Sequence, residues 1–180
     1  LTIELWANPT SVAGCGFVSL CNTLDSSTDV VDFITNSGTP GVLQCNYRNN
    51  TTQNAVYTNS VVVTTGDWQH LAVTINASGV CNLYRNGVLQ TVTRTLAQQT
   101  LRNVSRTVNG IGQTFSNLSF SYGGSLDEVA IYDYALSEAT LLGHYNQSSA
   151  VNYNTAVLAA TPTAYWRLGE ASGTTADDSS

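Results

Sequence analysis

Apolar and polar residues alternate with a period of two in short runs along most of the chain. The first run alternates in the order Leu1, Thr2, Ile3, Glu4, Leu5 and Trp6. Because successive side chains of a β-strand point to opposite faces, this period is typical of a strand with one face in the core. Similar runs follow at Phe17–Cys21, Val30–Thr35, Val42–Tyr47, Val61–Thr65, Leu71–Ile75, Val80–Tyr84, Val88–Thr93, Val104–Ile111, Leu118–Tyr122 and Leu126–Tyr132.

Turns rich in glycine and asparagine separate these runs, and this spacing predicts an all-β fold, an antiparallel sandwich or barrel. The clearest hairpin spans Val80–Thr93, where Asn86-Gly87 suits a type I′ turn. One short helix is expected at Ser137–Tyr145, because Ser137 can cap it and Glu138 complements the N-terminal end of its dipole.

The charge content of the chain excludes several function classes. Only 10% of the residues are charged, and they give a formal net charge of −6. A nucleic-acid partner is not expected, because phosphate binding needs a basic face. A cytosolic enzyme normally has a surface rich in Lys and Glu, whereas this surface must be built from Thr, Ser, Asn and Gln. No apolar run reaches the roughly 20 residues of a membrane helix, so membrane insertion is not expected.

The cysteine count is even, with residues at Cys15, Cys21, Cys45 and Cys81. No Cys-x-x-Cys pair occurs, which gives little support to a zinc site. Two disulfides fit an exported protein of this composition, and the sequence does not choose among the three possible connectivities. Four buried free thiols are the alternative.

Several motifs together resemble the laminin-G-like family, whose members have the concanavalin A-like jelly-roll fold. They are residues 1–6, the string Gly66-Asp-Trp-Gln-His-Leu-Ala-Val73, the string Leu83-Tyr-Arg-Asn-Gly-Val88, and Gly124-Ser-Leu-Asp-Glu-Val-Ala-Ile-Tyr-Asp133 followed by Ala135-Leu-Ser137. The resemblance implies an antiparallel two-sheet jelly-roll sandwich over residues 1–147, with one short C-terminal helix. It also places Trp68 at a core position of the family.

The tail departs from the family's order. Its string Ala164-Tyr-Trp-Arg-Leu-Gly-Glu170 resembles the family's first strand, yet it follows the helix. In one account residues 148–163 are a linker and residues 164–180 begin a second module of a tandem array. In the other, Tyr165–Leu168 completes a sheet that lacks its first strand, in its own domain or in a neighbouring copy.

No catalytic constellation is found, and the chain is expected not to be an enzyme. A retaining glycosidase needs two carboxylates about 5 Å apart, and no Glu-x-Asp-x-Glu strand is present. Sugar binding instead needs an aromatic plate with polar partners. We expect Glu4, Trp6, Tyr47 and Tyr84 to line such a surface on one sheet, unless that face is covered and Trp6 is packed.

The resemblance also implies a calcium ion, with Asp127 and Asp178 as the matching ligands. The oxygen-rich loop Asp25-Ser-Ser-Thr-Asp29 is a second candidate, or simply a solvated hairpin loop. Asn-x-Ser/Thr strings, which accept glycans in secreted proteins, occur at Asn49, Asn50, Asn76, Asn103, Asn117 and Asn146.

These observations lead to two main hypotheses for an extracellular, cell-surface or virion-surface protein. The first is a non-catalytic module for adhesion that binds glycans or cell-surface polysaccharide within a repeat-containing surface or phage fibre protein. The second is a structural repeat of a filament or virion surface, in which neighbouring copies assemble by strand donation. A third hypothesis is a non-catalytic sugar-binding appendage of a hydrolase.

Overall fold

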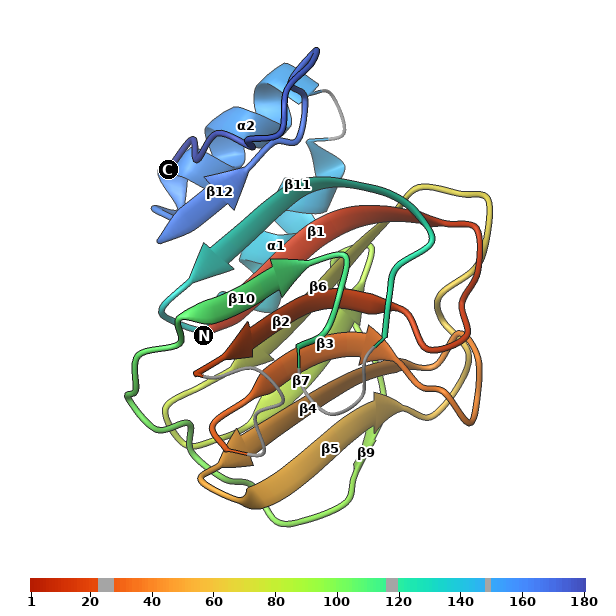
Figure 1. Ribbon diagram of the computed structural model, residues 1–180, viewed down its shortest axis with the longest axis vertical. Coiled ribbons are helices and arrows are strands. Elements are labelled where there is room, and N and C mark those ends of the chain that lie inside the picture. The colour runs from red at the N-terminus through yellow and green to blue at the C-terminus, as the bar shows by residue number, and fades with distance from the viewer. Residues whose placement is uncertain (23–27, 116–119, 148–149) are drawn as a thin grey trace.

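Two antiparallel six-stranded sheets packed face to face form the body of the protein in the computed structural model (Figure 1). The structure describes residues 1–22, 28–115, 120–147 and 150–180. Sheet 1 has the order β12(Ala164–Trp166), β11(Gly124–Tyr132), β1(Thr2–Pro9), β6(Gln69–Ile75), β7(Cys81–Arg85), β8(Val88–Leu89). Sheet 2 has the order β10(Val108–Ile111), β2(Gly16–Cys21), β3(Val31–Thr35), β4(Leu43–Asn49), β5(Thr52–Thr58), β9(Val92–Arg94).

The period-two pattern separates two cores on the two faces of sheet 1. Ile3 and Leu5 of β1 face sheet 2 and belong to the large core between the sheets. Ala72, Ala130 and Tyr132 belong to a second core on the outer face of the same sheet. Burying each large apolar side chain contributes about 1.5–3 kcal/mol, so both faces of sheet 1 stabilise the fold.

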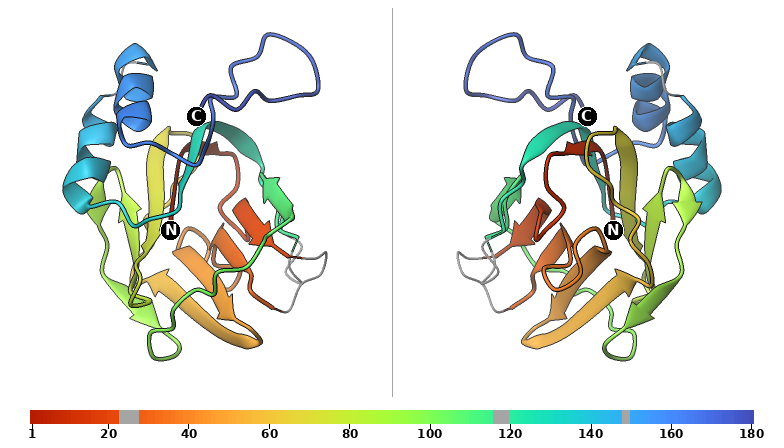
Figure 2. Two further views of the ribbon diagram at one scale, coloured as in Figure 1. Left: turned by 90° about the vertical axis from the view of Figure 1, so that its left-hand side faces the viewer. Right: turned by 90° about the vertical axis from the view of Figure 1, so that its right-hand side faces the viewer.

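Two helices, α1(Glu138–Asn146) and α2(Ala150–Ala159), cover this outer face (Figure 2). The predicted cap of α1 is confirmed, because the Ser137 side chain accepts a hydrogen bond from the Thr140 backbone N–H. Leu141 of α1 and Val157 of α2 are fully buried in the second core. Neither helix is long and apolar enough to cross a membrane, and no other helix occurs in the described residues.

Helix α2 was not expected from the sequence, because it lies within residues 148–163, and the sequence favours a linker for these residues. The tail strand β12 follows it and pairs with β11 of the same chain, with Ala130 opposite Tyr165. Residues after β12 loop away from the body and return beside it, where Asp178 bridges to Trp166 (Figure 2). The tail strand therefore extends the chain's own sheet; a following module stays a prediction.

The turn predicted at the tip of the hairpin Val80–Thr93 is present, but the second strand of that hairpin is split into the two short strands β8 and β9. Asn86 and Gly87 both have positive φ, as a type I′ turn requires. A Cβ on Gly87 would lie 2.5 Å from Leu142 Cα, so α1 also requires glycine here. After β8 the chain crosses over, and β9 pairs with β5 in the other sheet.

Three further strand predictions need correction. Residues 61–65 form no strand, and β10 covers only the end of the run expected at Val104–Ile111. Of the expected strand Leu118–Tyr122, residues 118–119 lie outside the described part, and Ser121 forms only an isolated bridge. Strand β5 was missed, because its sequence Thr-Gln-Asn-Ala-Val-Tyr-Thr has few apolar residues.

The structure has free thiols at all four cysteines, so the two expected disulfides are not present. Cys15 and Cys21 lie just before and at the end of β2, about 20 Å apart along an extended strand. A disulfide joins Cα atoms no more than about 7 Å apart. The one connectivity of two disulfides that pairs Cys45 with Cys81 would also need a bridge between Cys15 and Cys21, which this distance excludes.

Candidate functional site

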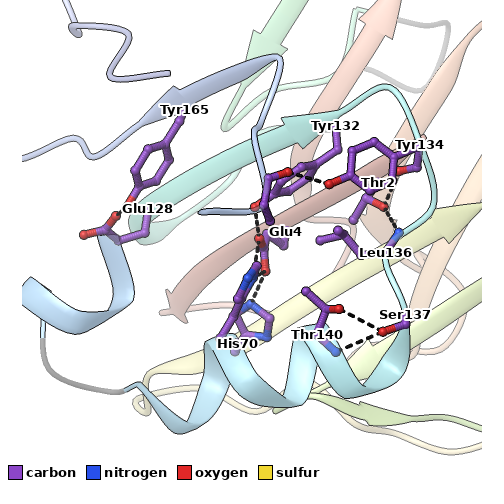
Figure 3. Close-up of polar contacts among 12 residues, drawn as sticks. Thr2, Glu4, His70, Glu128, Tyr132, Tyr134, Leu136, Ser137, Thr140 and Tyr165 are labelled. Carbon is purple, nitrogen blue, oxygen red and sulfur yellow. Dashed lines mark hydrogen bonds and ion pairs between the residues drawn. The ribbon is translucent and has the colours of Figure 1, made fainter. Parts of the chain in front are cut away.

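A buried carboxylate, Glu4, organises the outer face of sheet 1 (Figure 3). His70 Nε2 of β6 lies 3.0 Å from Glu4 Oε2, and His144 Nδ1 of α1 lies 3.0 Å from Oε1. The Tyr132 hydroxyl of β11 donates to Glu4 Oε1 at 2.5 Å. The cluster thus joins three strands to the helix that covers them.

The hydrogen bonds keep Glu4 ionised despite its complete burial. Burial has the largest single effect and raises its pKa, but the hydrogen bonds from His144 and His70, together with electrostatic attraction to the two rings, lower the pKa to about 2. A buried charge needs such partners, because removing it from water costs several kcal/mol. His70 is therefore a fully buried partner of Glu4, and its Nδ1 has no hydrogen-bond partner among the residues that the structure describes.

The predicted sugar-binding surface is wrong in its geometry. Glu4 is fully buried and Tyr84 is 4% exposed beneath the helices. Trp6 is partly buried and stacks on Tyr145 of α1, with ring centroids 5.8 Å apart. Tyr47 lies between the two sheets and donates a hydrogen bond to the Gly79 carbonyl. The helices seal this face, so the four residues do not form an exposed plate.

A second buried contact attaches the tail to the sheet. The Tyr165 hydroxyl donates a hydrogen bond to the Glu128 carboxylate (Figure 3), and burial raises the pKa of Glu128. Arg167 Nε lies 3.4 Å from the same carboxylate. Glu128 has a φ of 53° at a bulge of β11, where the register against β1 shifts. Asp178 holds the strand from its other side by accepting the Tyr165 backbone N–H.

The two expected calcium ligands are already hydrogen-bonded to the backbone. Asp127 Oδ1 accepts the Glu128 N–H, and Asp178 Oδ1 accepts the N–H groups of Tyr165 and Ser180. No group of three or more His, Cys, Asp or Glu suited to a metal occurs in the described residues. These two carboxylates alone do not fit an ion that takes six to eight oxygen ligands. Calcium at this position stays a prediction.

Residues 23–27 of the alternative loop lie outside the described part of the chain, but Asp29 is described. Asp29 is 3% exposed and accepts a hydrogen bond from Arg102 Nη1 at 2.9 Å. Arg106 Nε donates to the Asp29 carbonyl at 2.7 Å. These contacts position the segment 101–106 at one end of the sandwich.

This segment forms one wall of a cleft of about 680 Å³. The turn between β6 and β7 and residues 133–135 after β11 form the other walls. Its polar and aromatic lining comprises Asn76, Arg102, Asn103, Arg106, Asp133 and Tyr134. Binding sites for small molecules typically enclose about 300–1,000 Å³, so the cleft is large enough for a sugar.

The cleft combines a fixed aromatic ring with cationic side chains. The Tyr134 side chain is 42% exposed, and its hydroxyl donates to the Ala160 carbonyl at 2.5 Å. The Arg102 side chain is 47% exposed, and Arg106 Nη2 is buried without a hydrogen-bond partner in the described part of the chain. Tyr134 also lines a smaller cavity of about 380 Å³ beside both helices.

No sequence motif predicts this cleft, although two of its residues belong to the predicted glycosylation strings. Asn76 and Asn103 are exposed and belong to Asn-x-Ser strings. One further sequence signal for a site is that two of the six cationic residues lie within residues 101–106. Their approach to Asp29 and Tyr134 depends on the tertiary fold.

The glycosylation strings occupy different environments. Asn50 and Asn146 are exposed, while Asn49 is partly buried and donates to the Thr100 carbonyl. Asn117 lies outside the described residues. Glycosylation at these sites stays a prediction.

A family model described as the concanavalin A-like lectin/glucanases superfamily matches residues 1–141. The chain belongs to this superfamily. The match covers most of the sandwich of this lectin-like domain, but ends within α1. No curated protein sequence matches the domain.

Solved structures share the superfamily fold at low sequence identity. A SAP-like pentraxin from Limulus polyphemus is 16% identical, with a TM-score of 0.59, covering 83% of this chain and 70% of that chain. A Ruminococcus gnavus IT-sialidase CBM40 bound to α2,3-sialyllactose is 18% identical, with a TM-score of 0.62, covering 79% and 80%. The receptor binding domain of botulinum neurotoxin D is 13% identical, with a TM-score of 0.54, covering 81% and 36%. These likenesses show the lectin-like jelly roll.

Proposed function

We propose that this lectin-like domain is a non-catalytic glycan-binding module of an extracellular, cell-surface or virion-surface protein. The cleft that contains Tyr134 carries the proposal, because it is a concave site of suitable size. The solved CBM40 relative bound to sialyllactose supports glycans as the ligand class.

The chemistry of the cleft suits a sugar ring. The aromatic face of Tyr134 offers an apolar surface to the C–H groups of a pyranose. Asn103 supplies an amide that both donates to and accepts from hydroxyl groups. Asn76 supplies amide N–H donors, since its Oδ1 already accepts the backbone N–H groups of Ser78 and Val80. The Arg102 guanidinium adds donors for a hydroxyl or carboxylate oxygen.

Tyr134→Ala and Arg102→Gln are expected to weaken glycan binding at least about tenfold, because each removes a contact from the cleft. The purified chain is applied to a glycan array with and without calcium, and the variants are compared on the glycans it retains. Trp68→Ala is the matched control, since Trp68 is an exposed aromatic residue (47%) outside the cleft lining. Absence of glycan binding by the parent, or equal binding by the cleft variants, would contradict the proposal.

Trp68 also differs from the family core position that its motif suggests, because its side chain is largely open to solvent. It precedes β6, whereas the cleft includes the turn after β6. Trp68 therefore lies at the start of β6, whereas Tyr134, which follows β11, lines the cleft at the end of β6.

A second candidate function, assembly by strand donation, is favoured by the short strand β12 at the edge of sheet 1. If copies exchange this strand, the parent forms oligomers at high concentration and a chain ending at residue 163 does not. Light scattering with molecular-mass determination distinguishes the outcomes. A parent that stays monomeric at all concentrations removes this candidate and leaves the glycan proposal unaffected.

A further inference from the structure

Two cysteines from different sheets meet in the interior. Cys45 lies on β4 and Cys81 on β7, and these strands contact each other across the core. Both side chains are fully buried in the large core. The Cys45 thiol forms a hydrogen bond with the Cys81 side chain, and this bond and burial both raise the pKa of Cys45.

The other two cysteines have separate surroundings. The Cys15 thiol donates to the Ser11 carbonyl at 2.8 Å, before β2 begins. The Cys21 thiol lies 3.2 Å from Ser19 Oγ, at the other end of that strand. The geometry thus selects one pair from the four cysteines, which their spacing in the sequence could not do.

We propose that Cys45 and Cys81 form a single inter-sheet disulfide when the chain folds under oxidising conditions, while Cys15 and Cys21 remain thiols. In the exchange, a Cys45 or Cys81 thiolate attacks glutathione disulfide and releases one glutathione thiol. The second cysteine then attacks the mixed disulfide and releases another. The pair loses two electrons and two protons in total, and glutathione disulfide is reduced to two glutathione molecules.

The bond would connect β4 of sheet 2 with β7 of sheet 1 and close a loop that contains β5 and β6. Closing such a loop restricts the unfolded chain more than the folded one. Reduction is therefore expected to lower the Tm by about 10 °C. Because both thiols are buried, oxidation is expected during folding rather than in the folded protein.

The test folds the whole chain in a glutathione redox buffer and then labels free thiols with a maleimide in denaturant. We expect two labels per chain instead of four, and a chymotryptic peptide map that links Cys45 to Cys81. The variant carrying Cys15→Ser and Cys21→Ser should take no label and keep the Tm difference on reduction. Cys81→Ala should take a label at each remaining cysteine and show no such difference.

The peptide map of the parent decides the proposal even if a core variant does not fold. Four labelled thiols after oxidative folding would overturn it. Linkage of Cys45 or Cys81 to Cys15 or Cys21 would overturn it equally, because those bridges require a different fold.

Discussion

Replacement of Glu4 by alanine is expected to lower the free energy of unfolding by about 3–5 kcal/mol. The change removes the acceptor of His70, His144 and Tyr132, whose polar atoms then stay buried without a partner. Urea unfolding followed by tryptophan fluorescence measures the loss. Glu170→Ala is the control and should unfold like the parent, because Glu170 is exposed in the tail. A loss below about 1 kcal/mol would show that the Glu4 cluster is dispensable.

The same residue gives a pH dependence with a defined sign. The folded-state pKa of Glu4 is about 2, below the usual value of 4.5, so folding favours its ionised form. The stabilisation is complete above about pH 4.5 and is lost as the pH falls toward 2. Glu4→Gln removes this component. We therefore expect its unfolding free energy to fall less than that of the parent between pH 5 and 2; equal slopes would contradict the assignment.

Tyr165→Ala is expected to cost about 3–5 kcal/mol, comparable to other large-to-small changes of buried aromatic residues. The Tyr165 side chain is fully buried in the second core, and its hydroxyl satisfies Glu128. Tyr165→Phe keeps the ring and removes only the hydroxyl, and should cost about 1–3 kcal/mol. Chemical denaturation of both variants separates packing from hydrogen bonding. Unchanged stability in Tyr165→Ala would mean that the tail strand does not close the sheet.

The sandwich could be predicted because its signal is local. The alternation of apolar and polar residues in β1 predicts which side chains face the core. Asn86-Gly87 predicts a tight turn, and neither prediction depends on distant parts of the chain. Ser137 marked the start of α1 in the same way. Helix α2 was not predicted, because residues 148–163 were interpreted as a linker. In the structure Val157 packs this helix into the second core. Its position on sheet 1 is set by long-range packing.

The ligand site could not be predicted for a related reason. Trp6 and Tyr84 have the side chains that a sugar-binding face requires, and their period places them on the outer face of sheet 1. Whether that face is exposed depends on α1 and α2, which approach it from far along the chain. Tyr134 lies in the connection to α1, so the covering of the sheet also positions one wall of the cleft.

The tail strand β12 closes sheet 1 within a single copy of the chain. Isotope-filtered NOE spectroscopy on a mixture of labelled and unlabelled protein tests this directly. Closure of the sheet within one copy predicts cross-strand contacts between Ala130 and Tyr165 that arise within one molecule. Contacts that arise only between labelled and unlabelled copies, or no contacts at this pair, would contradict it.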